Sequence, residues 1–413
     1  MKLKVGKNSL IKLTFVMTIL LDAYCFTTIG NRNFTVFYPL SIFVILFGLI
    51  NLKVTLKGIA RNPFSMLMVI YIPLNFFING GVISSFLISM LLWTFYIMSY
   101  RNLSSKAFEN IIKAFQVIMN VMAIYGIYQF VAHCMRWPFA DIIFEGYMSA
   151  GYNWSNSINI AGHIFQRSNA IFREPSFFSQ FLGISVLVYI QGLLDNPNQN
   201  AKSLMWMIID LIAMLLSFSG TGVIITALGA ILLLMFNKAQ KIITYIKCHV
   251  LVVILVVIVA IGILIIPNSL NRYFFSRFAE FDSSNVESIS AYIRFIKPYM
   301  ATAEILGNAP FLGLGLGRTY NYTTVITGNL NNALSVALPR AFAELGIIGG
   351  VLYVLFMLKA INKHNILNGS YKAVLIGTYL MTFMHGTWSS EVYWLFLALL
   401  NITIIDKTYK IEN

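Results

Sequence analysis

The amino-acid sequence predicts an all-α, polytopic integral membrane protein. Of its 413 residues, 58% are hydrophobic and only 11% are charged, whereas about a quarter of the residues in a soluble domain are charged. Apolar runs of the length that a bilayer-crossing helix needs recur along the whole chain. These observations exclude a soluble enzyme and a nucleic-acid-binding protein, despite a formal net charge of +14. We expect residues 1–413 to form a single integral membrane domain.

The apolar runs predict about twelve membrane-spanning helices, within a range of ten to thirteen because a few runs are short. The first run follows a lysine-rich start that resembles a signal peptide, but no small-residue cleavage site comes after it. We therefore expect it to remain in the protein as the first span. The predicted spans cover residues 10–29, 34–52, 64–79, 82–100, 111–132, 175–194, 203–218, 221–236, 250–266, 341–358, 373–388 and 391–405.

Twelve spans place both termini on the same side of the membrane, and the lysines indicate which side. Most of the basic residues fall on the face that carries the N-terminus, and such an excess marks the cytoplasmic face. Nearly all the cations there are lysines. They are Lys2, Lys4, Lys7, Lys12, Lys53, Lys57, Arg61, Arg101, Lys106, Lys113, Lys202, Lys238, Lys241, Lys247, Lys359, Lys363, Lys372, Lys407 and Lys410.

The opposite face carries most of the arginines. Topology requires only positive charge, whereas the planar guanidinium group also binds phosphate oxygens in a bidentate manner. An arginine-rich outer face, against the usual charge bias, therefore indicates an anionic ligand there. The basic residues on this face are Arg32, Arg136, Arg167, Arg173, Arg272, Arg277, Arg294, Lys297, Arg318 and Arg340.

Two of the predicted outer loops are long, at residues 133–174 and 267–340. Long connections in a compact protein are usually either functional or disordered. Both loops contain several aromatic residues, which are scarce in disordered segments. We expect both loops to fold over the outer surface of the membrane.

The first candidate site opens the span that starts at Pro175. Proline suits the first turn of a helix, where its missing N–H has no intrahelical partner. Glu174 then lies at the positive end of the helix dipole, beside Arg173. Two interpretations remain open: an N-capping carboxylate next to an interfacial arginine, or a buried carboxylate, positioned by Arg173, that accepts a proton from a substrate hydroxyl.

The second candidate site lies in the second long loop. Arg294 and Lys297 are three residues apart and share one face if this segment is helical. A Gly-x-Gly-x-Gly run at residues 313–317 then leads into Arg318. Such a run is often only a tight turn, but glycines also let backbone amides approach a ligand closely. With Arg318 at its end, the run favours a phosphate-binding loop.

The third candidate site precedes and opens the span at 341–358. Asn331 and Asn332 come first, and Arg340 and Glu344 follow at a spacing of four residues, which predicts an intrahelical ion pair. Arg340 has a second interpretation, because an arginine at membrane depth is costly and tends to be functional.

The sequence predicts no metal site and no cofactor. No two of the five histidines are four residues apart on a helix, and the three cysteines are far from one another. Asp22 and Asp210 fall inside predicted spans, where acidic residues are functional by default.

Together these segments resemble the superfamily of O-antigen polymerases and ligases, and within it the Wzy-type polymerases of surface-polysaccharide repeat units. The resemblance covers most of the chain. Each motif alone is weakly specific, and the resemblance rests on the order in which the motifs follow one another. The matching residues are Arg173-Glu174-Pro175, Arg294, Pro310 with Gly313 to Gly317, Asn331-Asn332-Ala333-Leu334, and Glu344 to Gly349.

The resemblance implies a metal-independent membrane glycosyltransferase of GT-C-like architecture in the bacterial inner membrane. Such an enzyme joins undecaprenyl-diphosphate-linked oligosaccharides at the periplasmic face, in concert with a chain-length regulator protein. It implies no nucleic-acid partner. The residues expected to take part in catalysis are Glu174, Arg173 and Arg294, and Glu304 and Glu344 are alternatives to Glu174 as the base. Those expected to bind the diphosphate or the glycan are Arg318, Arg340, Arg277, Lys297 and Asn332.

Two alternatives remain: a ligase that transfers glycan to an acceptor such as lipid A core, and a flippase for lipid-linked oligosaccharides. Ligases carry a histidine where this chain has Asn331 and Asn332, and often an arginine near the stretch that here reads Ser219-Gly220-Thr221. Flippases have short outer loops and keep their charges in a central cavity. The sequence therefore favours the polymerase, with the sugar, the linkage and the kind of polysaccharide left open.

Overall fold

The computed structural model describes residues 7–29, 32–142, 147–149, 157–160, 163–196, 201–237, 296–321, 323–324, 328–329, 334, 336–384 and 390–405. It contains two compact units. Unit 1 comprises residues 1–118, 144–151 and 294–413, and unit 2 comprises residues 119–143 and 152–293. Helices make up most of the described part of both, and the strands form only short two-stranded pairs.

Three of the described helices are long and apolar enough to cross a membrane, namely Ser105–Met135, Pro175–Asp195 and Ala337–Ala360. A fourth candidate is the pair Phe37–Ile50 and Thr55–Arg61, which is bent by 97°. Shorter apolar helices accompany them, so the chain has the helical membrane-protein character that its sequence predicts. These are Leu10–Leu20, Pro63–Asn79, Ile83–Ser99, Gly220–Phe236 and Glu391–Leu400.

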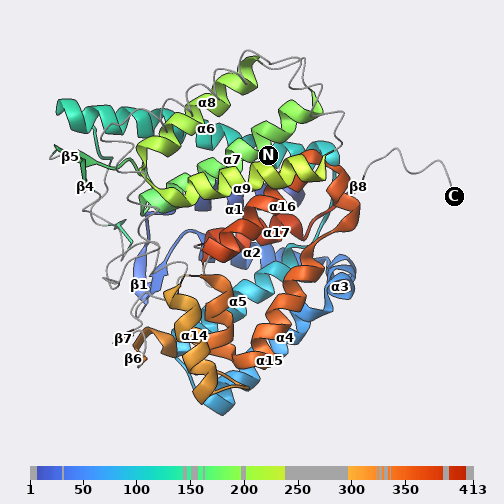
Figure 1. Ribbon diagram of the computed structural model, residues 1–413. Coiled ribbons are helices and arrows are strands. Elements are labelled where there is room, and N and C mark those ends of the chain that lie inside the picture. The colour runs from blue at the N-terminus through green and yellow to red at the C-terminus, as the bar shows by residue number, and fades with distance from the viewer. Residues whose placement is uncertain are drawn as a thin grey trace, which may run out of the picture. The chain divides into compact units, whose positions relative to one another are not determined.

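Unit 2 is built around one buried helix, α7, which packs against α8 and α9 (Figure 1). Gly222 lets α9 approach closely, because a Cβ atom there would lie 2.2 Å from the carbonyl oxygen of Ser179 on α7. The elements of this unit are the second half of α6 (Ser105–Met135), β4 (Ser157–Ile160), β5 (His163–Gln166), α7 (Pro175–Asp195), α8 (Ala201–Leu216) and α9 (Gly220–Phe236).

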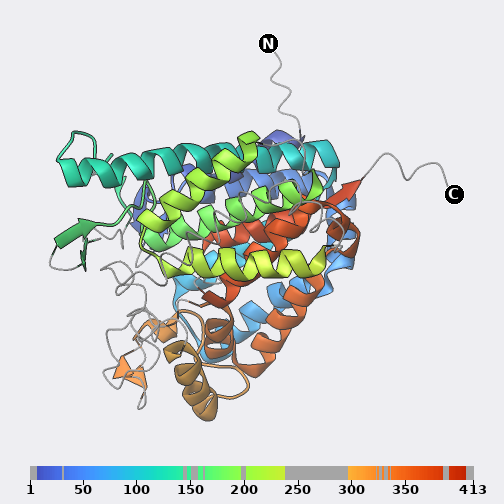
Figure 2. The ribbon, with the colours of Figure 1, turned by 45° about the horizontal axis from the view of Figure 1, so that its top comes forward.

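Unit 1 takes its helices from both ends of the chain, and α4 packs against α5 and α15. Figure 2 shows α14 lying against α15, where Thr302 Oγ1 donates to the carbonyl of Pro339 at 3.0 Å. The elements are α1 (Lys7–Leu20), β1 (Thr27–Ile29), β2 (Arg32–Phe34), α2 (Phe37–Ile50), α3 (Leu52–Arg61), α4 (Pro63–Asn79), α5 (Ile83–Ser99), β3 (Asn102–Ser104), the first half of α6, α14 (Lys297–Asn308), η3 (Arg318–Asn321), β6 (Thr323–Thr324), β7 (Gly328–Asn329), α15 (Ala337–Ala360), η4 (Lys363–Leu367), α16 (Gly369–Met384), α17 (Glu391–Leu400) and β8 (Thr403–Ile405).

An aromatic cluster forms the core of unit 1. Trp93 of α5 meets Trp394 of α17 edge to face with ring centroids 4.8 Å apart, and it meets Phe356 of α15 at 4.6 Å. Edge-to-face pairs of this kind add about 0.5–1.5 kcal/mol beyond the burial of their area. Helices that are distant in the sequence are thereby held together.

Most predicted spans coincide with observed helices, but two of the predicted ends are wrong. The span predicted at 10–29 ends at Leu20, because residues 27–29 pair with 32–34 as antiparallel strands. The span predicted at 391–405 ends at Leu400, because residues 403–405 pair with β3 in parallel. Threonine and isoleucine favour strands, but hydropathy alone does not distinguish a short strand from the continuation of a membrane-spanning helix. The span predicted at 250–266 lies outside the described residues.

The two arginines of the lysine-rich set both bind backbone carbonyls at helix ends. Arg61 donates to the carbonyl oxygens of Ala360, Leu400 and Asn401 at 2.9–3.2 Å, which close the C-termini of α15 and α17. Arg101 donates to the carbonyls of Met98 and Tyr100 after α5. Carbonyls at a helix C-terminus lack intrahelical donors, and the guanidinium fork reaches several at once.

Replacing Arg61 by Lys should therefore lower the stability of unit 1 although the charge is retained. One ammonium group cannot reach carbonyls on two helix ends together, and each buried carbonyl left unpaired costs about 1–3 kcal/mol. Thermal unfolding of the detergent-solubilised protein measures the loss. The control is Lys57→Arg, an exposed position on the same helix α3, which should leave the unfolding temperature unchanged. Equal unfolding temperatures for Arg61→Lys and wild type would contradict this role.

Candidate functional site

A buried ion pair lies near the start of α15. Arg340 Nε is 2.9 Å from Glu344 Oε1, and the two residues are only 7% and 1% exposed. Thr319 Oγ1 donates to the same carboxylate oxygen at 3.0 Å. The predicted ion pair is confirmed, and its carboxylate is fixed from two sides. The contact of Arg340 with Glu344 runs through Nε.

The helix that carries this ion pair is broken two residues after Glu344. Gly346 has φ 69° and ψ −171°, which interrupts the helical hydrogen bonds of α15. The segment after α14 repairs the break, because its amides donate to the carbonyls before Gly346 and its carbonyls accept from the amides after it. These bonds are Leu314 N to Ala343 O, Gly315 N to Glu344 O, Ile347 N to Pro310 O and Ile348 N to Phe311 O, at 2.8–3.3 Å.

This arrangement corrects the phosphate-loop interpretation of the glycine run. The amides of Gly313 and Gly315 donate to protein carbonyls, so they are not presented to a ligand. Gly313, Gly315 and Gly317 all have positive φ, a region that non-glycine residues seldom adopt. Glycine is required in this run because the segment packs closely against both the break at Gly346 and the turn between α4 and α5. A Cβ atom in the run would clash with these neighbours.

Replacing Gly315 by Ala should therefore destabilise the protein severely. A Cβ atom there would lie 2.5 Å from the carbonyl oxygen of Gly80, at a φ of +91°. The matched control is Gly307→Ala on α14, where a Cβ meets nothing within 4 Å and alanine favours the helix by about 0.5–1 kcal/mol. Unfolding temperatures of the two variants should move in opposite directions. A Gly315→Ala protein as stable as wild type would contradict the conclusion that close packing requires glycine in this run.

The other cations that were predicted to bind the diphosphate or the glycan are in different environments. Arg318 is exposed and follows the glycine run directly, next to Thr319 in the chain. Lys297 begins α14 and is half-buried. The structure thus brings Arg340 together with Glu344 and connects them to the Arg318 segment through Thr319. Arg277, Arg294 and Asn332 lie outside the described residues.

The first candidate site of the sequence analysis stands at the N-terminus of α7, in unit 2. Glu174 occupies the N-cap position with extended backbone, and Ser176 Oγ donates to its Oε2 at 2.8 Å. The Arg173 guanidinium lies over the ring of Phe177, 5.3 Å from the centroid. Both Arg173 and Glu174 are half-buried. The N-terminus of this 21-residue helix, the positive end of its dipole, therefore carries a carboxylate held by Ser176 and a guanidinium group held by Phe177.

A residue that the sequence interpretation missed fixes the loop that leads to Arg173. Gln129 of α6 accepts hydrogen bonds through Oε1 from the backbone amides of Asn169 and Ala170, at 3.0 and 2.8 Å. Ala170 has a positive φ of 50°, which such bonds help to hold. The sequence did contain a signal for this contact, since a glutamine in the middle of a long apolar helix needs a polar partner when it is buried.

Part of the outer arginine set has a structural role. Arg167 Nε donates to the carbonyl of Ser217 after α8, at 3.0 Å. At least one arginine of the set predicted for the outer face therefore binds the protein backbone, so the arginines of this set do not all serve a ligand. Among the described residues, no three His, Cys, Asp or Glu side chains are grouped as metal ligands would be.

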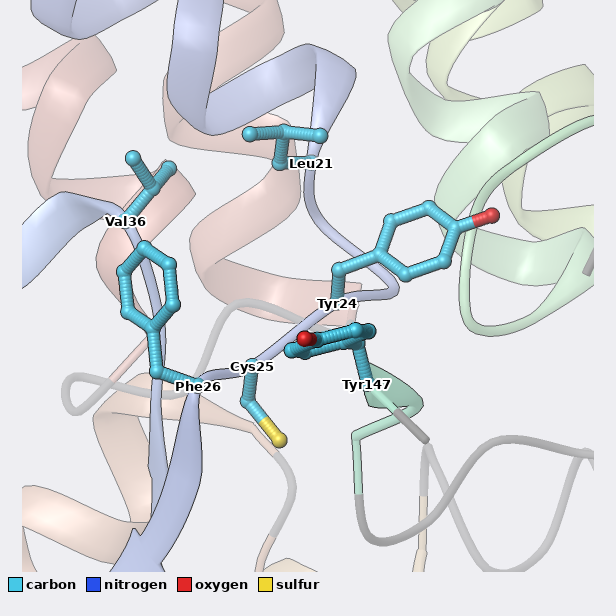
Figure 3. A pocket seen from close by; sticks show the side chains of 6 residues that line it. All are labelled: Leu21, Tyr24, Cys25, Phe26, Val36 and Tyr147. Atoms are coloured by element: carbon cyan, nitrogen blue, oxygen red, sulfur yellow. The ribbon is translucent and has the colours of Figure 1, made fainter. Parts of the chain in front are cut away.

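An apolar hollow of about 210 Å³ lies in unit 1, at the turn after α1 (Figure 3). The backbone of this turn pairs with residues 147–149, since Cys25 N donates to Tyr147 O at 2.7 Å. Its walls offer no convergent polar groups, so it does not suit the chemistry of a phosphate or a hydroxyl. Six residues line it: Leu21, Tyr24, Cys25, Phe26, Val36 and Tyr147.

Comparison with known proteins agrees with these features. No curated protein matches the chain. A family model does match, described as WcaD colanic acid polymerase, and it spans residues 12–405. The match takes in α15 with its ion pair, the N-terminus of α7, and both long loops. It confirms the resemblance to Wzy-type repeat-unit polymerases. The chain belongs to the WcaD colanic acid polymerase family.

Proposed function

We propose that this protein polymerises undecaprenyl-diphosphate-linked oligosaccharide repeat units at the periplasmic face of the bacterial inner membrane. The observation that carries the proposal is the family match over residues 12–405. In this proposal the chain crosses the membrane about twelve times with both termini in the cytoplasm. Residues 133–174 and 267–340 cover the outer surface, and a chain-length regulator protein acts beside them.

The buried ion pair gives Arg340 its proposed role. Glu344 accepts from the Nε of the guanidinium group and is itself held by Thr319, so the guanidinium group is oriented before substrate arrives. A fixed guanidinium suits a diphosphate leaving group, whose negative charge grows as the glycosidic bond breaks. Arg318, exposed beside Thr319, adds a second cation. Arg294, Arg277, Lys297 and Asn332 complete the proposed contacts to the diphosphate and the glycan.

Glu174 is the proposed base. The hydroxyl oxygen of the acceptor sugar attacks the anomeric carbon of the donor and gives its proton to Glu174, while the anomeric C–O bond to the lipid diphosphate breaks. The electron pair of that bond leaves with the diphosphate, and direct attack inverts the anomeric centre. Arg173, the preceding residue in the chain, is the proposed partner that positions this carboxylate. Because arginines meet the charge of the leaving group, the scheme uses no metal ion.

The family description names colanic acid, so we propose repeat units of an extracellular polysaccharide as the substrate class, with O-antigen units as the related case. The surface glycan of cells that lack this gene tests the function. A polymerase deletion leaves single repeat units on the acceptor, and the wild-type gene restores long chains. Acceptors with no repeat unit at all would identify a ligase or a flippase and would overturn the proposal.

A further inference from the structure

Gln180 is a buried polar side chain that the proposed mechanism does not use. It lies on α7 and is 0% exposed, yet neither its Nε2 nor its Oε1 has a hydrogen-bond partner within the described protein. Buried amide groups almost always have partners, since leaving one unpaired is costly. A carboxamide with both ends unpaired in the protein alone is therefore adapted to a ligand or to the water that the ligand replaces.

The position of Gln180 on α7 directs its side chain toward the candidate site. Helical side chains lean toward the helix N-terminus and cover the residues three and four positions earlier. For Gln180 these are Phe177 and Ser176. Ser176 is bonded to the Glu174 carboxylate, and Phe177 lies beneath the Arg173 guanidinium. Gln180 thus lies one turn beyond Ser176 and Phe177, on the side of the helix where these two residues contact Glu174 and Arg173.

The distances suit a sugar ring at the N-terminus of α7. Gln180 is five residues beyond Pro175, which corresponds to about 7.5 Å along the helix axis at 1.5 Å per residue. The backward lean of a glutamine side chain covers much of that separation. A carboxamide also presents one donor and one acceptor side by side, which complements two neighbouring hydroxyl groups of a pyranose.

We infer that Gln180 binds the acceptor sugar and holds its reacting hydroxyl against Glu174. Nε2 donates to the oxygen of one hydroxyl, and Oε1 accepts from its neighbour, while Glu174 takes the proton of the reacting group. The inference rests on the proposed function of Glu174, and it adds to that function the residue that selects and places the acceptor. Its ligand is a carbohydrate with two adjacent free hydroxyl groups.

The test compares Gln180→Met with wild type in two measurements on the purified full-length protein in liposomes. The probe is the lipid-linked repeat unit that accumulates in cells lacking the gene. We expect kcat/KM for chain extension to fall about 30-fold, as two ordinary hydrogen bonds imply, mainly through KM. The repeat unit should raise the unfolding temperature of wild type by more than that of Gln180→Met, which keeps the proposed contacts to the diphosphate. Without ligand, the variant should be at least as stable as wild type, because an unpaired buried amide is removed.

Gln191→Met is the matched control on the same helix. Gln191 is 1% exposed and is fully engaged with Asp195 and Asn237. Its replacement should lower the unfolding temperature and leave KM unchanged. A Gln180→Met protein with wild-type KM and a wild-type ligand-induced shift would overturn the inference. The shift measures binding alone, so wild-type protein that binds the repeat unit without extending it would refute the polymerase proposal and still decide the role of Gln180.

Discussion

Replacing Glu174 by Gln should nearly stop chain extension, with a rate loss of about 10²–10⁴-fold, the usual contribution of a positioned general base. Glutamine keeps an oxygen that accepts from Ser176 Oγ, as Glu174 does at 2.8 Å. The N-terminus of α7 should therefore stay folded while the proton acceptor is lost. The measurement is the initial rate of glycan extension with the lipid-linked repeat unit in liposomes.

Glu304→Gln is the control for this prediction. Glu304 is a half-buried carboxylate on α14 in the second long loop, and it was an alternative candidate for the base. We expect the Glu304 variant to extend chains at close to the wild-type rate. Wild-type activity in Glu174→Gln, or a collapse of activity in Glu304→Gln, would assign the base to another carboxylate.

Replacing Arg340 by Met should unfold much of the protein and abolish activity. The change leaves the Glu344 carboxylate buried without its cation, and breaking a buried ion pair in this way costs about 3–5 kcal/mol. Stability and function can be separated with the double variant Arg340→Met, Glu344→Met. Removing both charges should restore most of the unfolding temperature, while extension should remain about 10²–10³-fold slower because the charge on the leaving group is no longer met.

Arg340→Lys completes this series. Lysine retains the charge but cannot bind Glu344 with one nitrogen and a phosphate with two others. We expect a folded protein with strongly reduced extension. If the double variant extends chains at the wild-type rate, the ion pair is purely structural and the diphosphate is bound elsewhere.

The sequence predicted the helical elements better than their ends. Hydropathy and proline positions located α4 within one residue of its observed start at Pro63, and they located the start of α7 at Pro175. The strand that ends the last predicted span depends on a distant partner, Asn102 for Thr403, and a local pattern carries no information about such a partner. The first predicted span was misjudged for another reason, because the local strand pair of residues 27–29 and 32–34 lies at the end of an apolar run that reads as one continuous span.

The candidate site was predicted residue by residue but not in its geometry. The spacing of Arg340 and Glu344 gave their ion pair directly, because i,i+4 neighbours meet on a helix. The third member, Thr319, comes from a segment 25 residues away in the chain. The glycine run was misinterpreted because packing against the break at Gly346 and phosphate binding both require glycine. Gln180 was overlooked because its significance depends on burial that only the structure gives.

The most direct test of the central claim is chain extension by the purified protein alone. Liposomes that contain only this protein and the lipid-linked repeat unit from gene-deleted cells should yield a ladder of longer lipid-linked glycans. Each new glycosidic bond should release one lipid diphosphate without its glycan. A glycan that stays one repeat unit long, while the same liposomes bind it or move it across the bilayer, would contradict the claim and identify a flippase.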